Sequence, residues 1–188
     1  MESQINSFRF GKQHSHFITL FGYSSRSFPG LEIHGLGKYG KALREKIIYI
    51  TRARQLTVPL NRYVIVCELS DDVTTQDLWF EFPILLLYWH LAQLLPIEKL
   101  NNCFAVGQVH PSGIITEKWD QDILKEIQKR ELYLISSEKH LLSFLPGFNS
   151  CELLSHIPDI KWKEYQLKIP MIPEQSHSWS NNLLDLPR

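Results

Sequence analysis

The chain has 188 residues, of which 44% are hydrophobic and 21% are charged, and its twenty basic and twenty acidic residues cancel. This composition is typical of one globular domain and excludes a disordered or fibrous chain. The balanced charge also excludes a general attraction to nucleic acid or to anionic membranes, so any contact with a polyanion must be local.

The N-terminal segment, residues 1–12, is polar and lacks the apolar stretch of a secretory signal, so we expect a cytoplasmic protein. Its first predicted strands cover residues 16–23 and 30–34, separated by a turn-rich segment. Residues 38–54 have the apolar spacing of an amphipathic helix. Its predicted apolar face consists of Ala42, Leu43, Ile47, Ile50 and Ala53.

A buried strand is predicted at residues 62–69, with a polar loop after it. Residues 78–96 are apolar almost all round, which predicts a central buried helix, with a membrane span as the alternative. Residues 102–109 and 113–116 flank a tight-turn composition and predict a hairpin. The remaining predicted elements are a helix at 119–130, a strand at 131–135 and a short helix at 137–144.

Alternation of strands and helices predicts an α/β (α+β layered) domain over residues 1–157, in which a mixed β-sheet packs against helices mostly on one face. Residues 158–188 contain prolines and tryptophans without periodicity and form a predicted tail or linker. Their apolar residues are typical of a docking peptide, with a strap packed on its own domain as the alternative. The candidate anchors are Ile172, Trp179, Leu183 and Leu184.

Three local patterns occur in order along the predicted domain. Residues 28–36 read FPGLEIHGL, and Arg44 to Ile47 (REKI) follow in the predicted helix. Residues 71–84 end in WFEFPI, and residues 106–113 read VGQVHPSG. Together these segments resemble the N-terminal domain of the magnesium-chelatase (ChlI)-like ComM/YifB family over residues 16–145.

This resemblance implies the ribosomal-protein-S-five-like superfold, which the Lon proteolytic domain and the RadA C-terminal domain share. A Lon-type site needs a serine nucleophile with a lysine base, and residues 77–80 (DLWF) offer no hydroxyl. Lys118 and Lys125, near the position of that lysine, are interpreted as surface charges. ComM-type proteins carry an ATPase module after this domain, and no segment of this chain fulfils its GxxxxGK[ST] motif.

We therefore expect a non-enzymatic protein-interaction module that binds a partner protein, with a AAA+ ATPase of DNA processing or uptake as the partner class that the resemblance implies. A nucleic-acid-binding protein is one alternative, because the helix at 38–54 has a basic face that contacts phosphates or a partner. That face consists of Lys38, Lys41, Arg44 and Arg52. A solvated helix face is the plainer interpretation of the same charges.

A hydrolase with a rebuilt site is the other alternative, with Asp77 or Glu81 acting together with His110. Gly35, Gly37 and Gly40 form a GxGxxG-like run, which is only a weak signal for nucleotide binding. No cofactor is expected. No metal is expected either. The histidines are scattered along the chain, and the acidic residues near position 77 are interpreted as part of a solvated loop. Cys67, Cys103 and Cys151 are widely spaced, which predicts buried free thiols.

Overall fold

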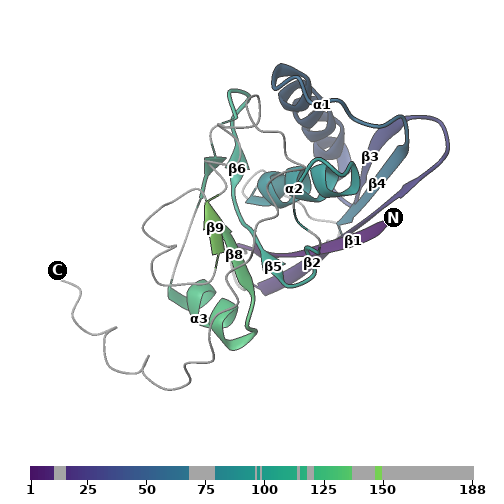
Figure 1. Ribbon diagram of the computed structural model, residues 1–188. Helices are drawn as coiled ribbons and strands as arrows, with labels where there is room; N and C mark the ends of the chain where they lie inside the picture. Colours follow the sequence, from purple (N-terminus) through teal and green to yellow (C-terminus); the bar gives the residue numbers. More distant parts are fainter. Residues whose placement is uncertain are drawn as a thin grey trace.

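The computed structural model describes residues 1–10, 16–67, 79–95, 97, 99–113, 115–117, 121–136 and 147–149 (Figure 1). Its helices are α1 (Gly37–Ala53), α2 (Glu81–Leu91) and α3 (Gln121–Lys129). In this part of the chain, seven strands form one sheet in the order β3 (Gly30–His34), β4 (Arg62–Cys67), β2 (His16–Ser25), β1 (Glu2–Arg9), β5 (Cys103–Phe104), β8 (Tyr133–Ser136) and β9 (Gly147–Asn149). A separate hairpin joins β6 (Gln108–Val109) to β7 (Ile115–Thr116).

The sheet is mixed, as expected for the α/β class. The β1–β2 and β2–β4 pairs are antiparallel, whereas β3 and β4 run parallel, as do β1 and β5, β5 and β8, and β8 and β9. The parallel β3–β4 pair is connected through α1, because parallel neighbours need a crossover long enough to return the chain to the same end of the sheet.

Strand β1 lies in the middle of the sheet, and the sequence did not predict it. It pairs with β2 over its whole length, from Glu2 opposite Tyr23 to Arg9 opposite His16. On its other side β1 pairs with β5. The side-chain amide of Asn6 also donates a hydrogen bond of 2.8 Å to the backbone carbonyl of Asn101, just before β5. Polar side chains occur on both faces of the strand, including the fully buried Ser7, so its sequence lacks the apolar alternation that identifies most strands.

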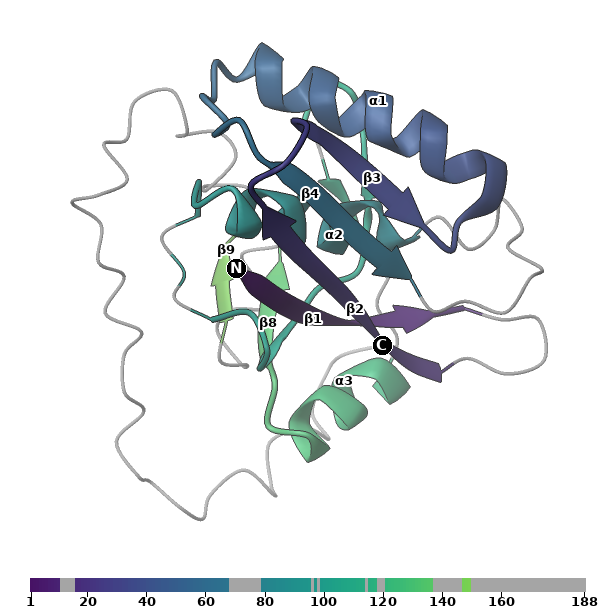
Figure 2. The same ribbon diagram turned by 90° about the vertical axis from the view of Figure 1, so that its right-hand side faces the viewer.

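Helices α1 and α2 cover one face of the sheet, with α1 lying along β3 and β4 (Figure 2). Every residue of α2 is buried, as the apolar sequence of this helix predicts. The main core lies between these helices and the strands and includes Leu20, Ile65 and Trp89, each at most 1% exposed. No helix among the described residues is long and apolar enough to cross a membrane.

Helix α3 packs on the opposite face, while α1 and α2, which carry most of the apolar helix surface, lie on one face as expected. A second core joins Ile123 and Ile127 of α3 to Phe8, Phe104 and Leu134 of the sheet. Alternate residues of a strand point to opposite faces, and the neighbours of Phe104 in the chain, Cys103 and Ala105, belong to the main core. The two cores therefore lie on the two sides of the sheet, near its β1–β5–β8 region.

The other predicted elements agree in part with the structure. The α1 register is confirmed for Leu43, Ile47 and Ile50, but Ala42 and Ala53 are exposed, and Gly40 and Thr51 are buried in their place. The predicted strand at 102–109 is divided into β5, which joins the main sheet, and β6, which forms the hairpin. Cys67 and Cys103 are buried free thiols, as predicted. The predicted helix at 137–144, Cys151 and the tail at 158–188 lie outside the described residues.

Candidate functional site

Glu81 is the buried acidic group at the start of α2, with only 2% of its surface exposed. Its carboxylate accepts a hydrogen bond from the Lys46 ammonium at 2.6 Å and another from the Tyr39 hydroxyl. The backbone N–H of Val109 donates to the second carboxylate oxygen at 2.8 Å. Burial and the hydrogen bond to Glu81 raise the pKa of Tyr39, so this hydroxyl stays protonated. Glu81 therefore links α1, α2 and β6.

His110 does not join Glu81 in a catalytic pair. Its Nδ1 lies 2.8 Å from the Ser112 hydroxyl and 3.2 Å from the Ser112 backbone N–H, in the exposed turn between β6 and β7. Both carboxylate oxygens of Glu81 already accept hydrogen bonds from other groups. No hydrogen bond or ion pair joins His110 to Glu81 among the described residues, and Asp77 lies outside them.

The glycine-rich segment after β3 forms a tight turn. Gly35 has a φ of +86°, and a Cβ there would lie 1.7 Å from the Cys67 carbonyl oxygen. Helix α1 begins at Gly37, so only two residues separate it from the end of β3 at His34. A phosphate-binding loop needs several successive backbone N–H groups to surround the anion. Gly35 is explained by the close approach of β4 and Gly40 by that of β3, whose Ile33 carbonyl would lie 3.0 Å from a Cβ there, whereas Gly37 has open space and a φ of +51°.

The predicted basic face of α1 is exposed to solvent. Lys38, Lys41 and Arg52 form no ion pair within the described part of the chain. Arg44 differs from them, because its guanidinium donates to the Glu45 carboxylate at 2.6 Å and 37% of its side chain is exposed. The three remaining cations and Tyr49, which is 59% exposed, share the outward side of the helix.

A second exposed surface, which the sequence did not predict, lies on the side of the sheet opposite α1 and α2, over the β3–β4–β2–β1 part, where none of the described elements covers the strands. We call it the open sheet face. Phe21 and Tyr23 of β2 project from it and are 40% and 39% exposed. In the strand register, Phe21 lies between Gln4 and Val66, and Tyr23 lies between Glu2 and Val64. Two aromatic rings therefore stand at the centre of a four-stranded surface.

Charged groups border the open sheet face at the β3 edge. Arg62 of β4 donates two hydrogen bonds of 2.8 Å to the Glu32 carboxylate of β3, and His34 lies 3.3 Å from the same carboxylate. The Arg62 guanidinium is the main reason that the pKa of Glu32 is lowered to about 2. Because these charges largely neutralise one another, this border attracts neither a polyanion nor a polycation strongly.

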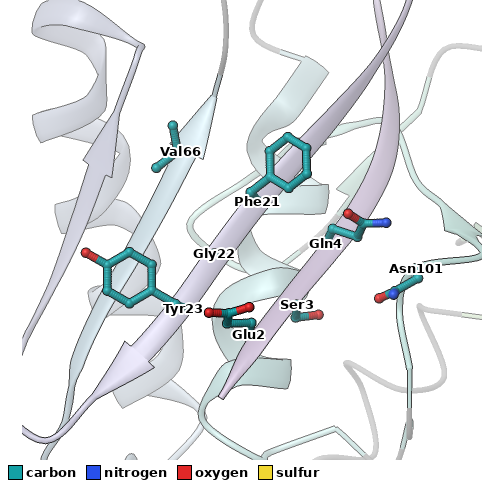
Figure 3. Close-up of a pocket in the computed structure, with 8 residues that line it drawn as sticks. All are labelled: Glu2, Ser3, Gln4, Phe21, Gly22, Tyr23, Val66 and Asn101. Atoms are coloured by element: carbon teal, nitrogen blue, oxygen red, sulfur yellow. The ribbon is translucent and has the colours of Figure 1, made fainter.

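At the opposite border, a shallow depression of about 290 Å³ lies beside the aromatic pair. Figure 3 shows Gln4, Asn101, Phe21 and Tyr23 around it. The amides of Gln4 and Asn101 offer both donors and acceptors, and the aromatic rings offer apolar area. This combination is suited to contact with another protein surface.

The sequence does contain a signal for the open sheet face. In residues 17–23 (FITLFGY), both sets of alternate residues are largely apolar or aromatic, whereas a strand with one solvated face normally shows polar residues at every second position. Only the structure shows that Arg130, directly after α3, lies over the Phe17 ring at 4.7 Å from its centre, while Phe21 and Tyr23 stay exposed.

The predicted docking anchors in the tail, Ile172, Trp179, Leu183 and Leu184, lie outside the described residues, as do Asp71, Asp72 and Lys118. Within the described residues, no group of three or more His, Cys, Asp or Glu side chains is placed to hold a metal ion. Lys125, which the sequence analysis assigned to the surface, is exposed and lies 3.5 Å from Asp122 on α3.

Comparison with known proteins does not assign the chain to a family. No protein-family model matches the sequence. No curated protein matches it either.

Proposed function

We propose that this chain is a non-catalytic protein-interaction module that binds a partner protein through the open sheet face. The observation that carries the proposal is the position of Phe21 and Tyr23, two partly exposed aromatic side chains at the centre of a sheet surface that no described element covers. Aromatic side chains are enriched at protein interfaces, where they bury large areas at a small cost in conformational entropy.

The surroundings of the pair favour a protein over a nucleic acid as the ligand of this face. Its border carries the mutually neutralised Arg62, Glu32 and His34, and the exposed carboxylate of Glu2 lies beside Tyr23 in the register. Nucleic-acid binding surfaces instead combine stacking aromatics with an excess of positive charge.

The partner class rests on resemblance alone. The sequence is similar to the N-terminal domain of ComM/YifB proteins, in which an ATPase module follows this domain in the same chain. These 188 residues carry no GxxxxGK[ST] motif of such a module, and we propose that this domain binds a AAA+ ATPase as an accessory in DNA processing or uptake. We place this activity in the cytoplasm, where such ATPases work.

The proposal is tested by site-specific photo-crosslinking of the full chain in cells of its native host. The photoreactive analogue benzoylphenylalanine replaces Phe21 or Tyr23 in two variants, and it replaces Tyr49, an exposed tyrosine on α1, in the control. We expect one discrete protein adduct from positions 21 and 23 and no such adduct from position 49. Mass spectrometry of the adduct then tests whether the partner is a AAA+ ATPase.

Binding of the purified partner gives the quantitative test. Tyr23→Ser should weaken binding at least tenfold, because loss of a central aromatic contact costs about 2 kcal/mol, whereas Tyr49→Ser should leave affinity unchanged. Both side chains are partly exposed, so circular dichroism should show that the variants fold. Crosslinks only from position 49, or only to a second copy of the chain, would overturn the proposal.

A second candidate function, binding of nucleic acid by α1, is favoured by Lys38, Lys41 and Arg52 on its outward side, which form no ion pair with any described residue. Such binding would depend steeply on salt, because each neutralised phosphate releases counterions. Fluorescence anisotropy with single- and double-stranded DNA at 50 and 200 mM salt, on the chain and on its Lys38→Gln, Lys41→Gln, Arg52→Gln variant, tests it. Binding that the triple variant retains would exclude α1 as the interface.

A further inference from the structure

A groove of about 350 Å³ opens on the helix-covered side of the sheet, away from the open sheet face. It lies between the C-terminal part of α1, the segment 55–61 that follows it, the first residues of β3 and β4, and Tyr88 of α2. Since it shares no residue with the open sheet face, what it binds can be tested independently of the proposed function.

Apolar side chains and aromatic rings form most of the groove lining. Leu31, Leu56 and Val58 line it, together with the rings of Tyr63 and Tyr88, which pack edge to face with their centres 5.3 Å apart. Leu60 at the rim is 83% exposed, and Phe28, next to the lining residue Pro29, is 91% exposed. These are the two most exposed large apolar side chains in the described part of the protein. An exposed apolar side chain such as Leu60 at the opening of a groove is typical of a binding site for an apolar group.

Two of the polar side chains in the groove are satisfied within the fold. The Thr51 hydroxyl donates to the Ile47 carbonyl at 2.7 Å and accepts from the Trp89 indole at 2.9 Å. The Tyr63 hydroxyl donates to the Pro59 carbonyl at 2.9 Å. These groups hold the walls in place and have little capacity left for a ligand.

A third polar side chain of the groove, Asn61, interacts with the Tyr63 hydroxyl. The remaining two, Arg52 and Tyr88, have no such partner among the described residues. Arg52 is exposed and forms no ion pair within the residues that the structure describes. Tyr88 is only 6% exposed, and in the same part of the chain its hydroxyl makes no hydrogen bond. Burial raises the pKa of Tyr88 to about 12, so the hydroxyl is a protonated donor at neutral pH. A cation and a buried donor thus remain beside an apolar groove.

We propose that this groove binds a short peptide segment of a partner protein in which a leucine or phenylalanine stands next to a carboxylate. The apolar side chain enters between Leu56, Val58 and Tyr88, and the carboxylate pairs with Arg52 at the mouth. Charge complementarity selects this ligand, because a bound neutral apolar segment would cover the Arg52 guanidinium without pairing its charge. Arg52 also presents a planar fork that matches a carboxylate.

The test uses blocked, fluorescein-labelled peptides in which Gly-Ser flanks surround Leu-Leu-Asp or Asp-Leu-Leu, with Asn-containing peptides as neutral counterparts. Anisotropy titration of the full chain should give about tenfold tighter binding for one acidic peptide than for its Asn counterpart. Amide shifts in ¹H–¹⁵N spectra should change at residues 55–61 and at residues 29–31. Arg52→Gln should abolish the preference for the acidic peptide and leave binding of the neutral peptide unchanged.

Three further variants separate this proposal from a general charge effect. Lys41→Gln removes a positive charge from the outward side of the same helix but does not line the groove, so it should leave the preference intact. Tyr88→Phe keeps the ring packing and should reduce the preference severalfold. Leu60→Asp, at an exposed position, should weaken binding of all the peptides about tenfold without affecting folding.

Two outcomes would overturn the proposal. The first is equal binding of acidic and neutral peptides in either order, or no binding of any of them. The second is amide shifts confined to Phe21, Tyr23 and their neighbours, which would place the peptide on the open sheet face instead.

Discussion

The Lys46 ammonium on α1 lies 2.6 Å from the carboxylate of Glu81 at the first turn of α2. Only 3% of the Glu81 side chain is exposed, compared with 29% for Lys46, so the carboxylate depends on its protein partners for solvation. The position of Glu81 at the start of a helix adds favourable interaction with the helix dipole. This pair connects the two helices that cover one face of the sheet.

Replacing Glu81 by Gln should destabilise the protein by about 2 kcal/mol, because the change leaves a partly buried ammonium without its counter-charge. The value is below that of a fully buried pair because Lys46 is able to turn toward solvent. Urea unfolding followed by tryptophan fluorescence measures it. Glu45→Gln on the exposed side of α1 is the matched control and should change stability by less than about 0.5 kcal/mol. Equal effects of the two substitutions would contradict the structural role of Glu81.

Gly35→Ala should destabilise the fold by more than about 3 kcal/mol, because the new methyl group would meet the Cys67 carbonyl and φ is positive. Gly37 provides the comparison, since its φ is +51° but no atom lies within 4 Å of a Cβ placed there. Gly37→Ala should cost only about 1 kcal/mol, the strain of the left-handed conformation alone. Thermal unfolding of both variants distinguishes steric overlap from backbone strain, and similar losses would argue against the tight β3–α1 turn.

The indole N–H of Trp89 donates to the Thr51 hydroxyl at 2.9 Å inside the core. Thr51→Val keeps the shape of the side chain but leaves this buried donor without an acceptor, which should cost about 1 to 3 kcal/mol. Thr57→Val is the control, because it makes the same change of side chain at an exposed position. If chemical denaturation gives the same stability for both variants, the Trp89–Thr51 hydrogen bond does not contribute as the structure indicates.

Glu32 should make stability depend on pH through its pairing with Arg62. The folded-state pKa of about 2 lies below the usual value of 4.5, so the unfolded chain takes up a proton first as pH falls. The pair therefore stabilises the protein above about pH 4.5, and this contribution is lost as pH falls toward 2. Arg62→Gln should raise the Glu32 pKa toward 4.5, as carboxyl ¹³C titration would measure. An unchanged Glu32 titration in this variant would show that Arg62 is not the cause.

Part of the candidate surface was accessible from the sequence, and part was not. The exposure of Lys38, Lys41 and Arg52 follows from helical periodicity, which is a local property. The roles of Glu81 and His110 were not accessible, since the partners of Glu81 come from α1 and β6, far away in the chain. For the same reason the groove around Tyr88 could not be predicted, because four separate segments form its walls.

The sequence by itself determined the α/β class, the register of Leu43, Ile47 and Ile50 on α1, and the complete burial of α2, because periodicity and mean hydropathy act within a few residues along the chain. Only the tertiary structure decided that the polar β1 strand lies in the middle of the sheet, since its pairing depends on hydrogen bonds to β2 and β5. It also decided that α3 covers Phe8 and Phe17 but leaves Phe21 and Tyr23 exposed. Which apolar side chains of a strand remain in solvent depends on the elements that pack over them, and those elements are distant in sequence.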